Sequence, residues 1–156
     1  MMKRDTIVER TLLIDAGPAT IWKALTDPQV TKLYLEGWQA RSTWKVGAPL
    51  LWFENVEGTE HLRAQGTVMA MIPGRRLRYT RLLTDGKLPD VPASYTTVDI
   101  VLDEERDGRT RVQLWHGDFA GLPHDVRRAR AAGRVWVESL VGLKRVTEEM
   151  QTQKAA

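Results

Sequence analysis

The stretch DVRRARAAGRVWVESLVGLKRVTEEM, residues 125–150, decides the fold of this chain. Its apolar and small residues recur at positions i, i+3 and i+4, which is typical of an amphipathic helix. These residues are Val126, Ala129, Gly133, Trp136, Val137, Leu140, Leu143 and Thr147. Charged residues occupy the opposite face, and Asp125 suits the positive N-terminus of a helix. At 1.5 Å per residue the helix would extend roughly 40 Å, enough to cross a whole domain.

Upstream of this helix, from Gly37 to His116, the hydrophobic pattern has a period of two. We predict strands near residues 38–44, 50–56, 61–72, 76–83, 94–102 and 110–116. Turn residues separate them at hairpin spacing, as at Glu57-Gly58, Pro73-Gly74 and Asp107-Gly108. Consecutive hairpins predict an antiparallel meander.

The N-terminal part predicts one further strand and two short helices. Residues 6–15 are rich in Ile, Val, Leu and Thr, as strands are. Pro18 then suits the first turn of a helix, and Asp27-Pro28 ends it and opens a second, at about residues 28–33. The element order is β-α-α-β-β-β-β-β-β-α. We therefore predict an α+β fold, with a curved antiparallel sheet of about six to seven strands around the long C-terminal helix.

A cavity between sheet and helix follows from their widths. Six strands at about 4.8 Å spacing make a sheet roughly 29 Å wide, whereas a helix is about 10–12 Å across. The sheet must curl around the helix, and such a space commonly holds an apolar ligand pocket. The alternative is that large side chains fill it, because the chain has six Trp and two Phe.

Composition narrows the class of protein. A length of 156 residues suits one domain, spanning 1–156 with its core at about 6–150. The chain has no cysteine, which excludes disulfide and thiolate chemistry. The first nine residues lack the apolar region of a signal peptide, and no stretch is apolar enough to span a membrane, so we expect a cytoplasmic protein. The net charge of +3 fits a soluble surface, and we expect neither nucleic acid nor a membrane as partner.

Several motifs along the chain resemble the START-like, or SRPBCC, superfamily, whose fold is the helix-grip fold. The most specific block is residues 14–28, IDAGPATIWKALTDP, and further matches are Trp44-Lys45-Val46-Gly47 and His116-Gly117. Within the superfamily the chain looks most like the heat-shock protein 90 ATPase activator homologue-like group. It departs from the usual pattern at Gly17, where the family has proline directly after alanine.

The resemblance implies a hydrophobic cavity between the sheet and the C-terminal helix. The superfamily includes lipid carriers, metabolite binders, polyketide cyclases and aromatases. Because it shares no common catalytic residues, the resemblance implies the fold and the cavity but no reaction.

His116 is the most interesting polar candidate. It shares its strand parity with Val112 and Leu114, so it could face the cavity and act as a general acid or base. It could equally be a histidine at a strand end, bonded to backbone or water. The other histidines, His61 and His124, lie on separate segments, so we predict no metal site and no cofactor.

The candidate ligand-binding residues lie on the strands and the gripping helix. They are Trp38, Trp52, Phe53, Tyr79, Tyr95, Leu114, His116, Trp136 and Leu140. Trp52 and Phe53 alternate, so either one could face inward. Arg10 interrupts an apolar face of the first strand; we interpret it as structural, although an inward arginine could bind a ligand's acid group. The cluster Arg127, Arg128, Arg130 and Arg134 is interpreted as a solvated helix face.

Three functions remain open on the sequence. The first is a carrier, sensor or sequestering protein that binds a small hydrophobic molecule, as a monomer or weak homodimer. The second is a cofactor-free cyclase, aromatase or hydrolase that uses His116 in the same cavity. The third is a co-chaperone-like module with a protein partner.

Overall fold

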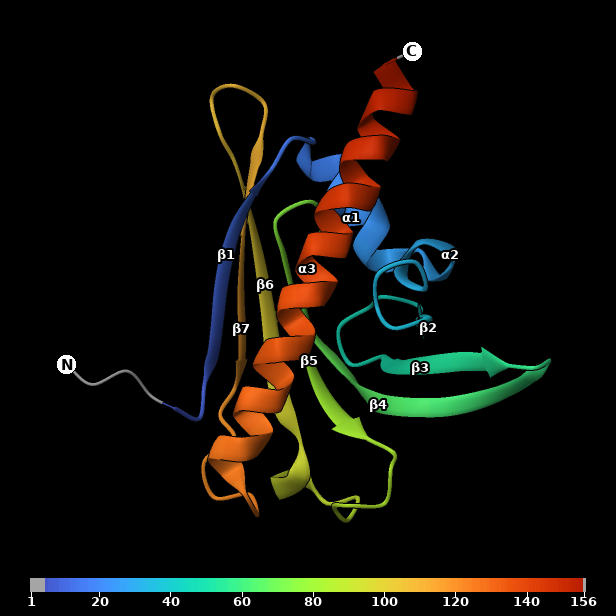
Figure 1. The fold of residues 1–156 in the computed structure, drawn as a ribbon, viewed down its shortest axis with the longest axis vertical. Helices are drawn as coiled ribbons and strands as arrows, with labels where there is room; N and C mark the ends of the chain where they lie inside the picture. The colour runs from blue at the N-terminus through green and yellow to red at the C-terminus, as the bar shows by residue number, and fades with distance from the viewer. Residues whose placement is uncertain (1–4, 156) are drawn as a thin grey trace.

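A seven-stranded antiparallel sheet curls around one long helix in the computed structural model, which describes residues 5–155 (Figure 1). The strand order is β1-β7-β6-β5-β4-β3-β2. The elements are β1 (Val8–Ile14), α1 (Pro18–Thr26), α2 (Pro28–Thr31), β2 (Trp38–Arg41), β3 (Pro49–Val56), β4 (Thr59–Ile72), β5 (Arg76–Leu83), the 3₁₀ turn η1 (Pro92–Ser94), β6 (Thr96–Glu104), β7 (Thr110–Gly117) and α3 (Asp125–Ala155). The predicted α+β helix-grip architecture is confirmed.

Several boundaries differ from the sequence prediction by one or more residues, and three of these differences have a clear local cause. Strand β2 ends at Arg41, and Trp44 adopts a left-handed backbone with φ of 58°, which an extended strand cannot include. Ser94 belongs to η1, because Pro92 favours a tight turn start. Helix α3 continues to Ala155, since the polar residues after Met150 are good helix formers. Within residues 5–155, no helix combines the length and the apolarity needed to cross a membrane.

Every second residue along the central strands points to the inward face of the sheet and is buried. In β6 the residues Val98, Ile100 and Leu102 are buried, and in β7 Val112, Leu114 and His116 are. The antiparallel register places Val98 opposite His116. The period-two pattern therefore assigns the core face correctly, because neighbouring side chains on a strand point to opposite sides.

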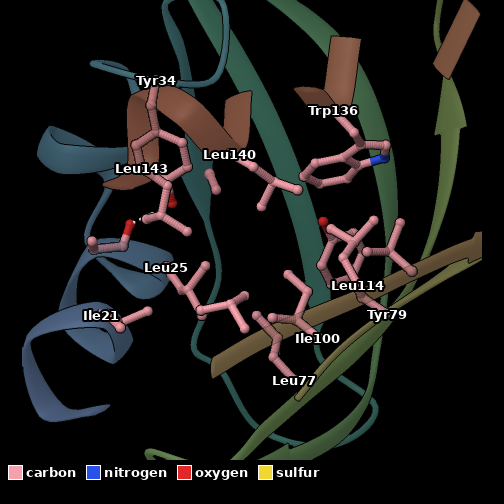
Figure 2. Close-up of a cluster of buried hydrophobic side chains, with 14 of the residues drawn as sticks. Ile21, Leu25, Tyr34, Leu77, Tyr79, Ile100, Leu114, Trp136, Leu140 and Leu143 are labelled. Carbon is pink, nitrogen blue, oxygen red and sulfur yellow. Dashed lines mark hydrogen bonds between the residues drawn. The ribbon is translucent and has the colours of Figure 1, made fainter. Parts of the chain in front are cut away.

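The hydrophobic core surrounds the middle and C-terminal part of α3. Figure 2 shows Leu140 and Leu143 of this helix facing Ile21 and Leu25 of α1 and Leu77 of β5. Each of these side chains is at least nine-tenths buried. Short helices α1 and α2 close this end of the sheet, as Figure 1 shows (light blue).

The C-terminal turns of α3 are held by hydrogen bonds to the turn between β1 and α1. Gln151 Oε1 accepts from Gly17 N at 3.1 Å and from Thr20 Oγ1 at 2.8 Å. Glu148 Oε2 accepts from Asp15 N at 2.8 Å. Gly17 is the N-cap residue of α1, so the departure from the family pattern at this position keeps the helix start intact.

Candidate ligand-binding cavity

The principal cavity lies between the first turns of α3 and the concave face of the sheet. Its volume is about 850 Å³, within the range of small-molecule sites. Apolar side chains line part of it, among them Leu82, Leu88, Phe119, Leu122 and Val135. Polar side chains line other parts of it, and the charged ones are Arg63, Arg81, Lys87, Arg127 and Arg128 together with Glu36, Glu54 and Asp85.

The middle of the trough is packed. The cavity there measures only about 30 Å³ and is lined by Tyr79, Trp136 and Leu140, among others. Trp52 fills much of the space, with its ring centroid 5.2 Å from that of Tyr79. The structure thus differs from the expected wholly apolar hollow: the aromatic residues fill the central part, and the open space at the N-terminal end of α3 has a mixed lining.

Trp136, His116 and Thr96 form a hydrogen-bonded chain at the inner wall of the larger cavity. Trp136 Nε1 donates to His116 Nδ1 at 2.9 Å, and His116 Nε2 lies 2.8 Å from Thr96 Oγ1. An indole N–H can only donate, so Nδ1 must be the unprotonated nitrogen of a neutral imidazole. The proton is therefore on Nε2, which donates to the threonine hydroxyl.

The surroundings of His116 favour its neutral form. The side chain is 1 % exposed, and burial lowers the pKa of His116 well below its ordinary value of 6.5, with the positive charge of Arg81 lowering it further. The ring of Phe119 packs against it with centroids 4.8 Å apart. Both ring nitrogens are engaged, so His116 is held as a fixed polar group at the base of the cavity.

Arg81 is the charged residue that lies beside the Trp136–His116–Thr96 hydrogen bonds, on the strand next to Thr96. It follows Leu77 and Tyr79 at the same parity on β5, and it pairs with Thr96 across the sheet. Burial lowers the pKa of Arg81 from its usual value, although Tyr79 and Glu36 partly oppose the effect. Among residues 5–155, no carboxylate forms an ion pair with its guanidinium and no side chain or carbonyl accepts a hydrogen bond from it. Arg81 instead lines the cavity.

Ser94 is a second polar residue that lines the cavity without a hydrogen-bond partner in residues 5–155. It is 6 % exposed and lines the cavity two residues before Thr96. Its hydroxyl has no hydrogen-bond partner in the described part of the chain. Sequence reasoning missed Arg81, Ser94 and Thr96; a charged residue on the apolar parity of β5 was the available signal for Arg81.

The predicted ligand-binding residues fall into three groups. Trp38 and His116 line the larger cavity. Trp52, Tyr79, Trp136 and Leu140 line the small central one. Phe53, Tyr95 and Leu114 line neither of these cavities: the Phe53 ring packs under Arg41, the Tyr95 hydroxyl donates to Asp90, and Leu114 is a core residue.

The arginines considered in the sequence divide between the cavity and the framework. Arg10 donates to the carbonyl of Glu9 and lies close over Gly133 of α3, which agrees with a structural role. Arg127 and Arg128 line the cavity, whereas Arg130 and Arg134 are exposed on α3. Within residues 5–155, no three His, Asp or Glu side chains gather as a metal site would require.

A curved antiparallel sheet gripping a C-terminal helix, with a cavity at one end of the helix, defines a START-like helix-grip protein. A family model described as "Activator of Hsp90 ATPase homolog 1-like protein" matches residues 15–148, and the chain belongs to this family. No curated protein sequence gives a significant match.

Solved structures share the fold at low sequence identity. ChR145 from Cytophaga hutchinsonii is 24% identical, with 99% of this chain and 100% of that one covered and a TM-score of 0.73. The Aha1 dimer from Colwellia psychrerythraea is 18% identical, with 91% and 96% covered and a TM-score of 0.69. DynU16, from the dynemicin biosynthetic locus, is 18% identical, with 95% and 49% covered and a TM-score of 0.73. At these identities the likeness establishes the fold alone.

Proposed function

We propose that this protein binds a small organic molecule in the cavity between α3 and the sheet, as a carrier, sensor or sequestering protein. The observation that carries the proposal is the 850 Å³ cavity beside a core that is otherwise closely packed. Buried residues such as Thr96 and Phe119 line its inner end, and exposed residues such as Asp85 and Lys87 line its mouth, so a small molecule can enter from solvent and reach buried groups. Its mixed lining suits an amphipathic molecule.

An acid–base role for His116 receives less support from the geometry. Nδ1 accepts from Trp136 and Nε2 donates to Thr96, so neither nitrogen is free to take a substrate proton. Protonation at Nδ1 would also break the bond to Trp136 in a buried site. An enzyme that used His116 as acid or base would therefore have to break one of these two hydrogen bonds, whereas ligand binding leaves both intact.

A fluorescent apolar probe tests the binding proposal. N-phenylnaphthylamine gains fluorescence in apolar surroundings, and we expect wild-type protein to bind it saturably. Ala131 lines the cavity from α3, and Ala131→Trp would fill much of the space, weakening binding at least about tenfold. The matched control is Arg134→Trp, which places the same indole on the exposed face of the same helix.

Equal binding by wild type and Ala131→Trp would contradict the proposal. Native mass spectrometry of protein purified from its own host is a second test, and we expect a co-purifying small molecule that Ala131→Trp does not retain. A ligand present at about a hundred times its Kd raises the free energy of unfolding by about 2.7 kcal/mol. A broad panel of amphipathic molecules that never raises the melting temperature would also count against the function.

A further inference from the structure

The inner end of the cavity presents hydrogen-bond donors whose protein acceptors are missing. Three groups converge there from neighbouring elements: Arg81 from β5, Ser94 from η1 and Thr96 from β6. Arg81 and Thr96 are direct cross-strand partners, which places side chains on one face of a sheet about 5 Å apart at Cβ. All three belong to the lining of the larger cavity.

The hydrogen-bonded chain from α3 has a direction. Trp136 Nε1–H donates to His116 Nδ1, and His116 Nε2–H donates to Thr96 Oγ1. Thr96 Oγ1 is thereby an acceptor, so its own hydroxyl proton must be donated elsewhere, and no residue in 5–155 accepts it. This series of hydrogen bonds therefore ends in the Thr96 hydroxyl, a donor that lines the cavity. Hydrogen bonds linked in series polarise one another, which strengthens the last donor.

Arg81 adds charge to these donors. A guanidinium carries only N–H donors and matches carboxylate, sulfonate and phosphate groups with two parallel hydrogen bonds. Arg81 is half-buried and opens onto the cavity, and its guanidinium has no partner in residues 5–155, so the site is suited to an anion. Arg127, Arg128 and Lys87 add positive charge to the lining, whereas among its carboxylates Glu54 is paired with Arg63, and Glu36 and Asp85 are exposed.

We propose that the ligand is an amphipathic organic acid, whose anionic group accepts hydrogen bonds from Arg81, Ser94 and Thr96. Its apolar body lies against Phe119, Leu122 and Val135, which line the same cavity. A neutral molecule of the same shape leaves the Arg81 charge without a partner and binds more weakly. This inference rests on the proposed function and names the ligand class for that site.

A matched pair of probes separates the charge from the apolar body. Anilinonaphthalenesulfonate and N-phenylnaphthylamine share one ring system, and only the first carries a sulfonate. We expect wild-type protein to bind the sulfonate about tenfold or more tightly than the neutral probe. Arg81→Met should abolish this preference, weakening the sulfonate about tenfold to a hundredfold, as for a lost charge-assisted pair, with the neutral probe unchanged.

Two further variants control for net charge and for folding. Arg134→Met removes the same charge from the exposed face of α3 and should leave both affinities as in wild type. Ser94→Ala removes a hydroxyl without a protein partner, so it should fold normally and weaken only the sulfonate, by several-fold. The Ser94→Ala result and the wild-type preference decide the matter even if Arg81→Met does not fold.

The outcomes distinguish this inference from the function on which it rests. If the neutral probe binds and Ala131→Trp blocks it, but the sulfonate has no advantage, the acid-binding inference is overturned and the binding function stands. An Arg81→Met protein that keeps the full preference for the sulfonate overturns it in the same way. If Ala131→Trp blocks neither probe, both proposals fail.

Discussion

Trp136 Nε1 donates a hydrogen bond to His116 Nδ1 across 2.9 Å, and this bond joins the gripping helix to the sheet. The two rings meet edge to face, with centroids 6.2 Å apart and planes at 87°. Trp136 lines the small central cavity and His116 the larger one. Figure 2 shows the indole nitrogen turned away from Leu140, which lies on the core side. The pair therefore forms the wall between packed core and open cavity.

Replacing Trp136 with Phe should destabilise the protein through this bond. Phe keeps a ring in the core but leaves the buried Nδ1 of His116 without a donor. An unsatisfied buried acceptor costs about 1–3 kcal/mol in the free energy of unfolding. Urea denaturation measures the change. Trp115→Phe is the matched control, since Trp115 neighbours His116 on β7 and points to the opposite face of the sheet. This variant should change the free energy of unfolding by no more than about 0.5 kcal/mol.

Stability should fall as the pH drops below about 6.5 because His116 stays neutral in the folded state. Its folded-state pKa is lowered by burial, so below 6.5 the unfolded chain takes up a proton that the folded chain does not. The free energy of unfolding then decreases by up to about 1.4 kcal/mol per pH unit. Above about 7 both states are neutral and the contribution is zero.

Histidine variants isolate this pH effect. His116→Gln carries an amide with both a donor and an acceptor and no titrating proton, so its unfolding free energy should stay level from about pH 6.5 to 5. His61→Gln, at an exposed position of β4, should retain the wild-type slope. Carboxylates with lowered pKa values, such as Glu60, Asp107 and Glu148, lose their contribution only at more acidic pH. A wild-type slope that survives in His116→Gln would contradict the assignment.

Gly66 should tolerate no side chain. A Cβ at this position would lie 1.7 Å from the carbonyl oxygen of Thr80 and 3.3 Å from the Cα of Arg81. The close approach of β4 to β5 thus sets the backbone that carries Arg81. Gly66→Ala should lower the free energy of unfolding by about 3 kcal/mol, as overpacking does. Gly17→Ala is the control, because the nearest atom there is Gln151 Oε1 at 3.9 Å; equal melting temperatures for the two variants would refute the steric argument.

Gln151 should matter more to stability than its place near the end of α3 suggests. Its side-chain oxygen accepts from Gly17 N and Thr20 Oγ1, and Thr20 is buried. Gln151→Ala should cost about 1–2 kcal/mol, as expected when one partly buried and one buried donor lose their acceptor. Gln153→Ala, an exposed position two residues later, should change little. Thermal unfolding of the two variants checks the difference.

The sequence could place some residues of the candidate site but could not predict most of their contacts. His116 could be placed on the inward face from its parity with Leu114, and Trp136 from its helical stripe. The bond between them could not be predicted, because it joins residues 20 positions apart on different elements and depends on the rotation of α3 over the sheet. Phe53 and Tyr95 were equally attractive aromatics, yet one packs against Arg41 and the other bonds to Asp90 in the loop before η1.

The amphipathic period of residues 125–150 and the alternation of the strands by themselves determined that this chain folds as a curved sheet around one helix. Those patterns are local, since each element's apolar face is set by its own geometry. Only the tertiary structure decided that the central trough is filled by Trp52 and Trp136 and that the open space lies beside Arg81. The volume left over depends on how side chains from distant segments interdigitate, and no single segment carries that information.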